Sequence, residues 1–450
     1  MLARCILPCF LLLLATGPAR PATNDSARGQ LPVFLYTVAK SYEPLAWMRG
    51  EDRLPSGASI FLKNANEERA LLPDFAASGD PVVSFDGERV LFAGKAHATD
   101  AWQIWEIALE SGAVRRITVG PEDCIRPFYL PDDRIVYARK IAGRFVIEVK
   151  DTEGKRLAIT YMPGSALPTG ILHDGRILFS AVYPLGTGAV PEIYTVYSDG
   201  SGVESYRCDH GHARYSATQG SSGEILFASE TTLARFTSAR AGELRFSVPA
   251  GEYGGDFAET GASEWLLSWR PDANAAFQLM QWKQGSAALQ PAIIKPGVNV
   301  IQPALVIPRR MPNRHPSGLH DWPNANLLCL NAYTSKYPFP AGSIHSVRLY
   351  TRDFEGSPKL LGSASVERDG SFFVQVPAEG PLQIELLDAA GKTLKREAGF
   401  FWMRRGEQRG CVGCHAGPET APENAVPLTL LKSTTPADLT GVAQNASGGH

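Results

Sequence analysis

Short apolar runs separated by turn-forming residues dominate the chain from residue 31 to residue 310. The clearest runs are Arg89–Ala93, Arg134–Ala138 and Arg176–Ser180, and each follows a turn that contains aspartate. Runs rich in Val, Ile, Leu and Phe and bounded by Gly, Asp and Ser are typical of β-strands joined by tight hairpins. The pattern therefore predicts an all-β fold for this part of the chain.

These strand patterns repeat at a regular interval. The turn residues Asp86, Asp132, Asp174 and Ser222 stand 46, 42 and 48 residues apart, which is about the length of one four-stranded propeller blade. A single blade cannot bury its own apolar face, so the repeats must stack around a common axis. We expect a β-propeller over residues 31–310 with six blades, or seven as the alternative. The repeats resemble those of TolB and WD40-like propellers.

The remaining chain divides into segments that differ in composition and strand pattern. Residues 298–307 are expected to return to the first blade and complete it. A proline-rich linker is expected over 311–325, followed by closely spaced short strands over 326–400 that suggest a small β-sandwich. Residues 401–432 would form a C-terminal cofactor-binding segment. The tail over 433–450 is rich in Thr, Ala, Gly and Asn and is expected to be disordered.

The most specific motif is C-x-x-C-H, formed by Cys411, Cys414 and His415. This spacing is that of a c-type haem attachment site, in which two thiols bond to the porphyrin vinyl groups and the histidine ligates the iron. A redox pair, half of a zinc site and a disulfide are the alternatives. A redox pair would need a βαβ unit and a zinc site a second ligand pair, and the sequence offers neither. We therefore expect one covalently attached haem c.

The first residues resemble an export signal. Arg4 precedes a short apolar run, Ile6–Leu14, and small residues follow it. We expect a signal peptide over residues 1–22 and a mature protein in the periplasm or outside the cell. No later segment is long and apolar enough to predict a transmembrane helix.

Charge excludes some partners. The chain has 44 basic and 46 acidic residues and a net charge of −2, with the two signs interspersed. No basic block predicts nucleic-acid binding and no polybasic patch predicts membrane binding. A redox partner protein is expected, but the charge pattern does not identify it.

Two other groups of residues could carry chemistry. On a strand, Cys208, His210 and His212 would point to one face and could bind zinc or copper. The alternative is a solvated loop between blades, because three ligands make only a partial site. Cys124 and Cys329 are expected to be small buried residues, with a thiol near the haem as the alternative.

The iron ligand opposite His415 is left open by the sequence. Met403 would raise the reduction potential and suit electron transfer, although its aromatic neighbours also suit a core position. His315, His320 or His345 would lower the potential. An open position would favour small-molecule chemistry.

The region over 326–427 resembles the middle domain of the hydrazine synthase alpha subunit family. The resemblance is carried by Arg404–His415, by Pro418–Pro427, and upstream by Val366–Phe372 and Val376–Ala378. In that family a propeller precedes a small β domain and a haem. The resemblance therefore implies the same order here.

Hydrazine synthesis itself is not expected. The family's enzyme has a Tyr shortly after its motif near the haem iron, whereas Glu419 stands fourth after His415 here, and its further haem domain has no counterpart. We expect an exported monohaem c-type cytochrome for electron transfer, with the propeller as a docking platform, because no catalytic acid or base can be named beside the haem. The alternatives are a haem-dependent redox enzyme acting on a small nitrogenous molecule at the haem–propeller interface, and a haem-bearing ligand-binding or sensing module.

Overall fold

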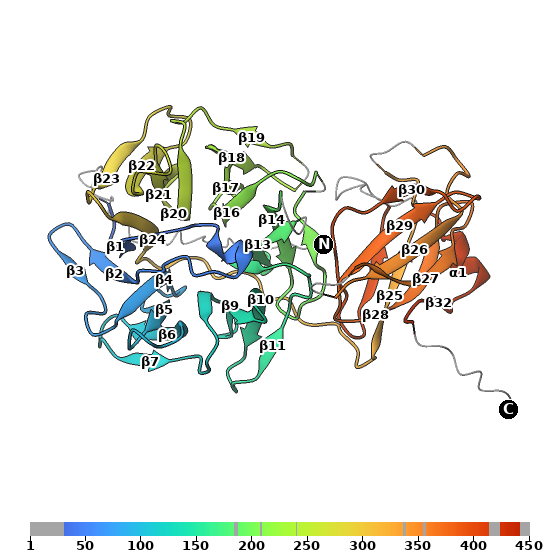
Figure 1. The fold of residues 1–450 in the computed structure, drawn as a ribbon, viewed down its shortest axis with the longest axis horizontal. Helices are drawn as coiled ribbons and strands as arrows, with labels where there is room; N and C mark the ends of the chain where they lie inside the picture. Colours follow the sequence, from blue (N-terminus) through green and yellow to red (C-terminus); the bar gives the residue numbers. More distant parts are fainter. Residues whose placement is uncertain are drawn as a thin grey trace, which may run out of the picture.

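Two β-rich bodies lie side by side in the computed structural model (Figure 1). The structure describes residues 31–183, 188–207, 209–239, 241–335, 339–353, 357–413 and 424–441. These residues form eight four-stranded sheets, six in the first body and two in the second. A 3-10 turn, η2 (Ala46–Arg49), and a one-turn helix, α1 (Leu428–Lys432), complete the regular structure of these ranges. Neither described helix has the length and apolar character needed to cross a bilayer.

The six sheets of the first body are the blades of a propeller. Their strands, grouped by blade, are β1 (Phe34–Ala39), β2 (Ala58–Lys63), β3 (Glu68–Ala70) and β24 (Asn299–Leu305); β4 (Ala77–Val83), β5 (Arg89–Lys95), β6 (Gln103–Ala108) and β7 (Val114–Arg116); β8 (Cys124–Tyr129), β9 (Ile135–Ile141), β10 (Arg144–Lys150) and β11 (Arg156–Ala158); β12 (Ala166–Ile171), β13 (Ile177–Tyr183), β14 (Val190–Val196) and β15 (Glu204–Ser205); β16 (Arg214–Gln219), β17 (Ile225–Ser229), β18 (Thr232–Phe236) and β19 (Leu244–Arg245); and β20 (Glu252–Gly261), β21 (Glu264–Arg270), β22 (Gln278–Lys283) and β23 (Gln290–Ile293). The predicted all-β class and the six-bladed count are confirmed.

The first blade is closed by strands from both ends of the propeller. Strand β24 pairs antiparallel with β1, with Phe34 opposite Leu305 and Ala39 opposite Asn299. The expected return of residues 298–307 to the first blade is therefore correct. This pairing leaves no open edge between the first and last repeats, so the ring is held by ladder hydrogen bonds as well as by packing.

The inner strand of every blade carries an irregularity at an equivalent place. Register shifts interrupt β24, β4, β8, β12, β16 and β20 where they pair with their neighbours. Asp80, Arg126, Ser216 and Gln302 take positive φ values of 54° to 57° at these bulges. A bulge re-aims a side chain out of the pleat, and here it places polar groups around the propeller axis.

A buried ionic network joins the blades at that axis. Asp80 is 1% exposed and accepts hydrogen bonds of 2.6 Å from Arg53 at both carboxylate oxygens. Gln302 donates to the same carboxylate at 2.5 Å, and the backbone N–H of Arg126 at 3.1 Å. The guanidinium of Arg126 continues the network to Asp256 at 2.6 Å. Because buried charges must be paired, these contacts satisfy the carboxylate of Asp80 inside the propeller.

The linker after the propeller is hydrogen-bonded to two of the blades. The side chain of Arg309 donates to the carbonyl of Val83 at 2.8 Å, and the backbone N–H of Asn313 donates to the carbonyl of His173 at 2.9 Å. Gly175, with φ +90°, lies under this segment, and a Cβ there would stand 2.1 Å from the carbonyl oxygen of Asn313. The glycine is needed both for the turn and for the close approach of the linker.

The second body is a sandwich of two sheets. One sheet has the strand order β31 (Gln408–Cys411), β25 (Asn324–Cys329), β28 (Phe372–Pro377) and β32 (Ala437–Asp438); the other has β27 (Lys359–Ser365), β26 (Ser346–Thr351), β29 (Leu382–Leu387) and β30 (Thr393–Arg396). Strands β25, β26 and β28 alternate buried and partly exposed residues, which is the period-two pattern of a half-buried strand. Leu327, Val347, Leu349 and Val374 belong to the buried core.

The structure differs from the sequence-based expectations beyond residue 400. Strand β31, expected in a separate segment, pairs parallel with β25 and extends the sandwich. The tail expected to be disordered from Ser433 contributes β32, which pairs with β28, and Leu439 is 4% exposed. Burial of this apolar side chain fixes the segment despite its polar composition. Residues 1–22 and 442–450 lie outside the described residues.

Candidate functional site

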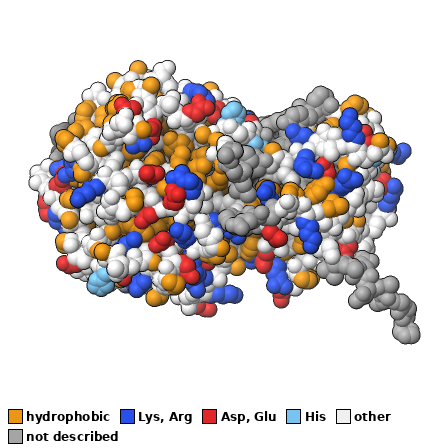
Figure 2. All heavy atoms as spheres, in the orientation of Figure 1, with side chains coloured by type: hydrophobic (Ala, Val, Ile, Leu, Met, Phe, Trp, Pro, Cys, Tyr) orange, Lys and Arg blue, Asp and Glu red, His pale blue; other side chains and the backbone are white. Residues whose placement is uncertain are grey.

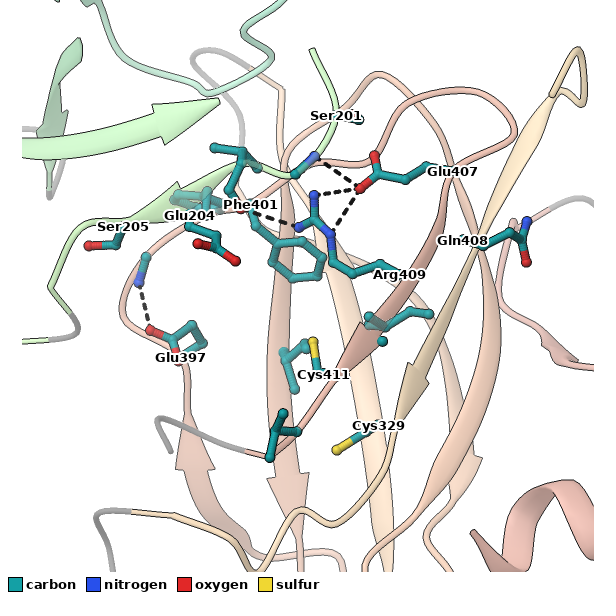
Figure 3. A pocket seen from close by; sticks show the side chains of 18 of the residues that line it. Ser201, Glu204, Ser205, Cys329, Glu397, Phe401, Glu407, Gln408, Arg409 and Cys411 are labelled. Carbon is teal, nitrogen blue, oxygen red and sulfur yellow. Dashed lines mark hydrogen bonds and ion pairs between the residues drawn. The ribbon is translucent and has the colours of Figure 1, made fainter. Parts of the chain in front are cut away.

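A cavity of about 710 Å³ lies between the fourth blade and the sandwich. Its propeller wall comes from β14 and the loop that follows it, and its sandwich wall from β25, β28, β29 and β31. Figure 3 shows this pocket, with the side chains of Phe401, Cys329 and Cys411 facing it. A volume of this size lies within the range of about 300–1,000 Å³ that is usual for small-molecule and cofactor sites.

The first cysteine of the C-x-x-C-H motif lines this cavity. Cys411 is the last residue of β31 and stands opposite Cys329 across the parallel pair. Burial raises the pKa of the Cys411 thiol, which does not favour the thiolate that a redox pair or a zinc ligand needs. Cys414 and His415, the other two motif residues, lie outside the described residues.

The backbone beyond Cys411 passes through a narrow gap. A Cβ at Gly413 would stand 2.2 Å from the carbonyl oxygen of Thr334 and 2.6 Å from that of Asn331. Glycine is therefore required for this close approach. Gly410, three residues earlier, has open space where a Cβ would be.

A buried ion pair holds β31 against the propeller. The guanidinium of Arg409 donates to one carboxylate oxygen of Glu407 at 2.7 and 3.0 Å, and Glu407 is 7% exposed. The same oxygen accepts a 3.2 Å hydrogen bond from the backbone N–H of Gly202 in the propeller. Its other oxygen accepts from the backbone N–H of Arg404 at 2.7 Å. The pair therefore fixes the position of the strand that carries Cys411.

The segment before β31 alternates between the two bodies. Trp402 is fully buried in the propeller's hydrophobic core, whereas Met403 is fully buried in the core of the sandwich. Phe401 lines the cavity. Met403 therefore occupies the core position that its aromatic neighbours favoured, and it is absent from the described residues that line the cavity.

The three candidate histidine ligands are separated by the fold. His315 lines the cavity, and its ring stacks on that of Tyr197 with centroids 3.7 Å apart and planes 19° apart. His320 stacks instead on Trp322. His320 and His345 are absent from the described residues that line the cavity.

His210 comes from the predicted Cys208, His210 and His212 cluster and also lines the cavity. Its Nδ1 lies 2.6 Å from a carboxylate oxygen of Glu192, and its Nε2 lies 3.4 Å from one of Glu397. Burial lowers the pKa of His210, but the hydrogen bonds to Glu192 and Glu397 outweigh burial and raise it to about 10. The imidazole is therefore held as a cation at neutral pH.

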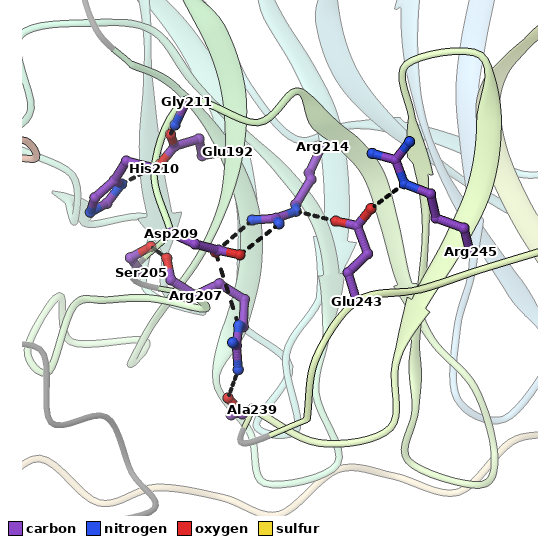
Figure 4. A network of polar contacts seen from close by, with 10 residues as sticks. All are labelled: Glu192, Ser205, Arg207, Asp209, His210, Gly211, Arg214, Ala239, Glu243 and Arg245. Carbon is purple, nitrogen blue, oxygen red and sulfur yellow. Dashed lines mark hydrogen bonds and ion pairs between the residues drawn. The ribbon is translucent and has the colours of Figure 1, made fainter. Parts of the chain in front are cut away.

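The residues next to His210 in the sequence do not join it in a metal site. Asp209 pairs with Arg214 at 2.9 and 3.0 Å, and Arg214 also contacts Glu243 at 2.9 Å (Figure 4). His212 is exposed. Cys208 lies outside the described residues, and in the part of the chain that the structure describes no three His, Cys, Asp or Glu residues are grouped to hold a metal ion.

The residues that face the cavity suit a porphyrin. Leu327, Phe372, Leu386 and Phe401 provide an apolar wall, and Cys411 places a thiol in it. Lys395 also lines the cavity and is a cation of the kind that pairs with carboxylates, whereas the guanidinium of Arg409 is already paired with Glu407. The volume, the apolar wall and the thiol of Cys411 are compatible with a porphyrin at this place.

Sequence reasoning could not find several of these groups. Glu192 and Glu397 are 205 residues apart in the chain, yet both contact His210. Tyr197 gave no signal because single aromatic residues in strand-rich sequence usually belong to a core. The polar residues of the Arg404–Arg409 stretch could be singled out from the sequence only through the family resemblance.

Comparisons with known proteins agree with that resemblance. Residues 348–416 match the family model of the hydrazine synthase alpha subunit middle domain. The Kuenenia stuttgartiensis hydrazine synthase subunit alpha is 33% identical over 78 residues, which cover 17% of this chain and 10% of that protein. The expected family relationship is confirmed for this region, and the match spans about a tenth of the curated relative.

One solved structure shares the fold over a longer range. The Kuenenia stuttgartiensis hydrazine synthase structure superposes with a TM-score of 0.77 at 17% identity, over 90% of this chain and 72% of that chain. TolB from Acinetobacter baumannii gives a TM-score of 0.46 at 14% identity, over 61% of this chain and 66% of that one. The first similarity extends across both bodies and shows a common architecture.

Proposed function

On the premise that residues 348–416 match the hydrazine synthase alpha subunit middle-domain family, we propose that this protein is an exported monohaem c-type cytochrome. One haem c would be attached through Cys411 and Cys414, with His415 as an iron ligand. Its task would be electron transfer to or from a partner protein. Hydrazine synthesis is not part of the proposal.

The observation that carries the proposal is the position of Cys411. The motif's first thiol lines a cavity of about 710 Å³ that is walled by both bodies. A bound haem would supply a one-electron couple at its iron. The apolar side chains around the thiol would exclude water from the cofactor, and a low local dielectric is one of the means by which a protein tunes such a couple.

The chain's own residues would hold that environment in place. Glu407 and Arg409 join the motif's strand to the loop at Gly202, and Trp402 inserts into the propeller core. The propeller would thus serve as a wall of the site and as a platform for the partner. On the face shown in Figure 2, basic and acidic side chains are intermixed over both bodies, so shape rather than net charge would select that partner.

A second candidate is a haem-dependent redox enzyme acting on a small molecule. It is favoured by the ionisable groups His210 and Glu397, which line the same cavity as Cys411. These groups supply the acid and base that the sequence alone does not place beside the motif.

The visible spectrum of the reduced protein, with and without CO, separates the two candidates. Protein for this test is made in a host competent for cytochrome c maturation. A low-spin haem whose spectrum does not respond to CO supports electron transfer. A high-spin haem that binds CO supports the enzyme. Recovery of the mature chain from the periplasmic fraction, cleaved near residue 22, tests export.

A further inference from the structure

We infer that His315 would ligate the iron of the proposed haem. This inference rests on the proposed haem. It names a ligand from the propeller–sandwich linker, a segment that carries no recognisable ligand motif.

The three other candidate ligands named from the sequence, Met403, His320 and His345, have contacts outside the cavity. Met403 is fully buried in the sandwich core, and its backbone carbonyl accepts from the N–H of Glu379. The ring of His320 stacks on Trp322. The backbone N–H of His345 is bonded to the carbonyl of Leu387 at a strand end. None of these three is among the described residues that line the cavity.

His210 lines the cavity but its imidazole is not free to ligate. Both ring nitrogens face carboxylates, Nδ1 that of Glu192 at 2.6 Å and Nε2 that of Glu397 at 3.4 Å. An imidazole that donates from both nitrogens has no lone pair for a metal. His315 differs, because no described residue forms a hydrogen bond or ion pair with its ring, and its aromatic contact is with Tyr197.

The linker is built to hold His315 at this place. Two residues earlier, Asn313 is bonded to the carbonyl of His173 and packs closely over Gly175. The next residue is Pro316, which restricts His315 to extended backbone conformations. The stack on Tyr197 then fixes the plane of the ring. A ligand whose backbone and ring are both fixed before binding loses little entropy when it coordinates.

The test compares the His315→Ala and His320→Ala variants, because both residues lie in the same linker. Electron paramagnetic resonance and visible spectra of the oxidised proteins report the spin state. We expect His315→Ala to convert the haem from low spin to high spin and to bind CO, and added imidazole to restore the low-spin spectrum. His320→Ala should keep the wild-type spectrum.

A third variant covers the case in which His315→Ala does not accumulate. His315→Met keeps a ligand of suitable reach and should raise the reduction potential, because methionine replaces histidine on the iron. A low-spin, CO-unresponsive spectrum in His315→Ala, or an unchanged potential in His315→Met, would overturn the assignment while leaving the proposed haem intact. A wild-type protein without haem would overturn both proposals.

Discussion

The indole N–H of Trp402 donates a 3.0 Å hydrogen bond to the carbonyl oxygen of Gly200. This contact joins the segment that precedes the C-x-x-C-H motif to the fourth blade of the propeller. The indole also packs near Tyr161 and Phe179, with ring centroids 6.2 and 6.4 Å away. One side chain of the second body thus belongs to the core of the first.

Replacement of this side chain should weaken the whole protein. We expect Trp402→Ala to lower the free energy of unfolding by about 3–5 kcal/mol, because it leaves a large cavity in the propeller core. Trp402→Phe keeps most of the apolar volume and should cost less. Urea unfolding followed by circular dichroism measures both changes. Equal, small losses for the two variants would show that the indole is not a core group.

The buried Glu407–Arg409 pair should behave as one unit. Glu407→Ala leaves the guanidinium of Arg409 without its carboxylate, and breaking a buried pair in this way costs about 3–5 kcal/mol. The double variant Glu407→Ala, Arg409→Ala should lose less than the sum of the two single variants, because it leaves no unpaired charge. A double-mutant cycle from urea unfolding provides the coupling energy. Strict additivity would contradict the pairing.

The gap around Gly413 makes a matched pair of glycine substitutions informative. Gly413→Ala would place a Cβ 2.2 Å from the carbonyl oxygen of Thr334, so the segment leading to Cys414 must shift. Gly410→Ala meets open space. We expect the first variant to lower the fraction of chains that carry haem and the second to leave it unchanged, as measured by haem absorbance per protein. Similar haem content in both would argue against a constrained approach.

The buried ionic network around Asp80 predicts that the stability of the protein depends on pH. Burial raises the pKa of Asp80, but the charges of Arg53 and Arg126 and their hydrogen bonds outweigh burial and hold it below the ordinary value of 3.8. A carboxyl with a depressed pKa contributes stability that is present above its unfolded-state value and is lost as pH falls below it.

Asp80→Asn removes that contribution. At pH 7 we expect the variant to be less stable by about 3–5 kcal/mol, because Arg53 and Arg126 lose a buried partner. The difference from wild type should shrink as pH falls below about 3.8. Urea titrations between pH 3 and pH 7 measure it. A difference that stays constant over this range would contradict the role given to the charge.

Local patterns predicted most of the fold. The spaced turns at Asp86, Asp132, Asp174 and Ser222 gave the repeat length of a blade, and the apolar run at residues 298–307 gave the closing strand β24, because both signals are contained in short stretches. The parallel pairing of β31 with β25 and the docking of Leu439 were missed, since they join segments separated in sequence and carry little periodicity of their own.

The candidate site could be predicted from the sequence only where its functional residues are close together in the chain. Cys411, Cys414 and His415 form such a motif. Met403 packs in the sandwich while its neighbour Trp402 packs in the propeller, and no local pattern shows which body each side chain enters. The position of His315 depends on the path of a proline-rich linker, which no local pattern specifies either. The contacts of His210 with Glu192 and Glu397 require the fold to bring three elements together.

The central claim is that one haem is covalently bound through Cys411 and Cys414. Intact-mass spectrometry of the denatured mature protein, made with a cytochrome c maturation system, tests it most directly. The account predicts the polypeptide mass plus that of one haem, and the loss of this addition when both cysteines are replaced by alanine. A wild-type chain with the polypeptide mass alone would contradict it.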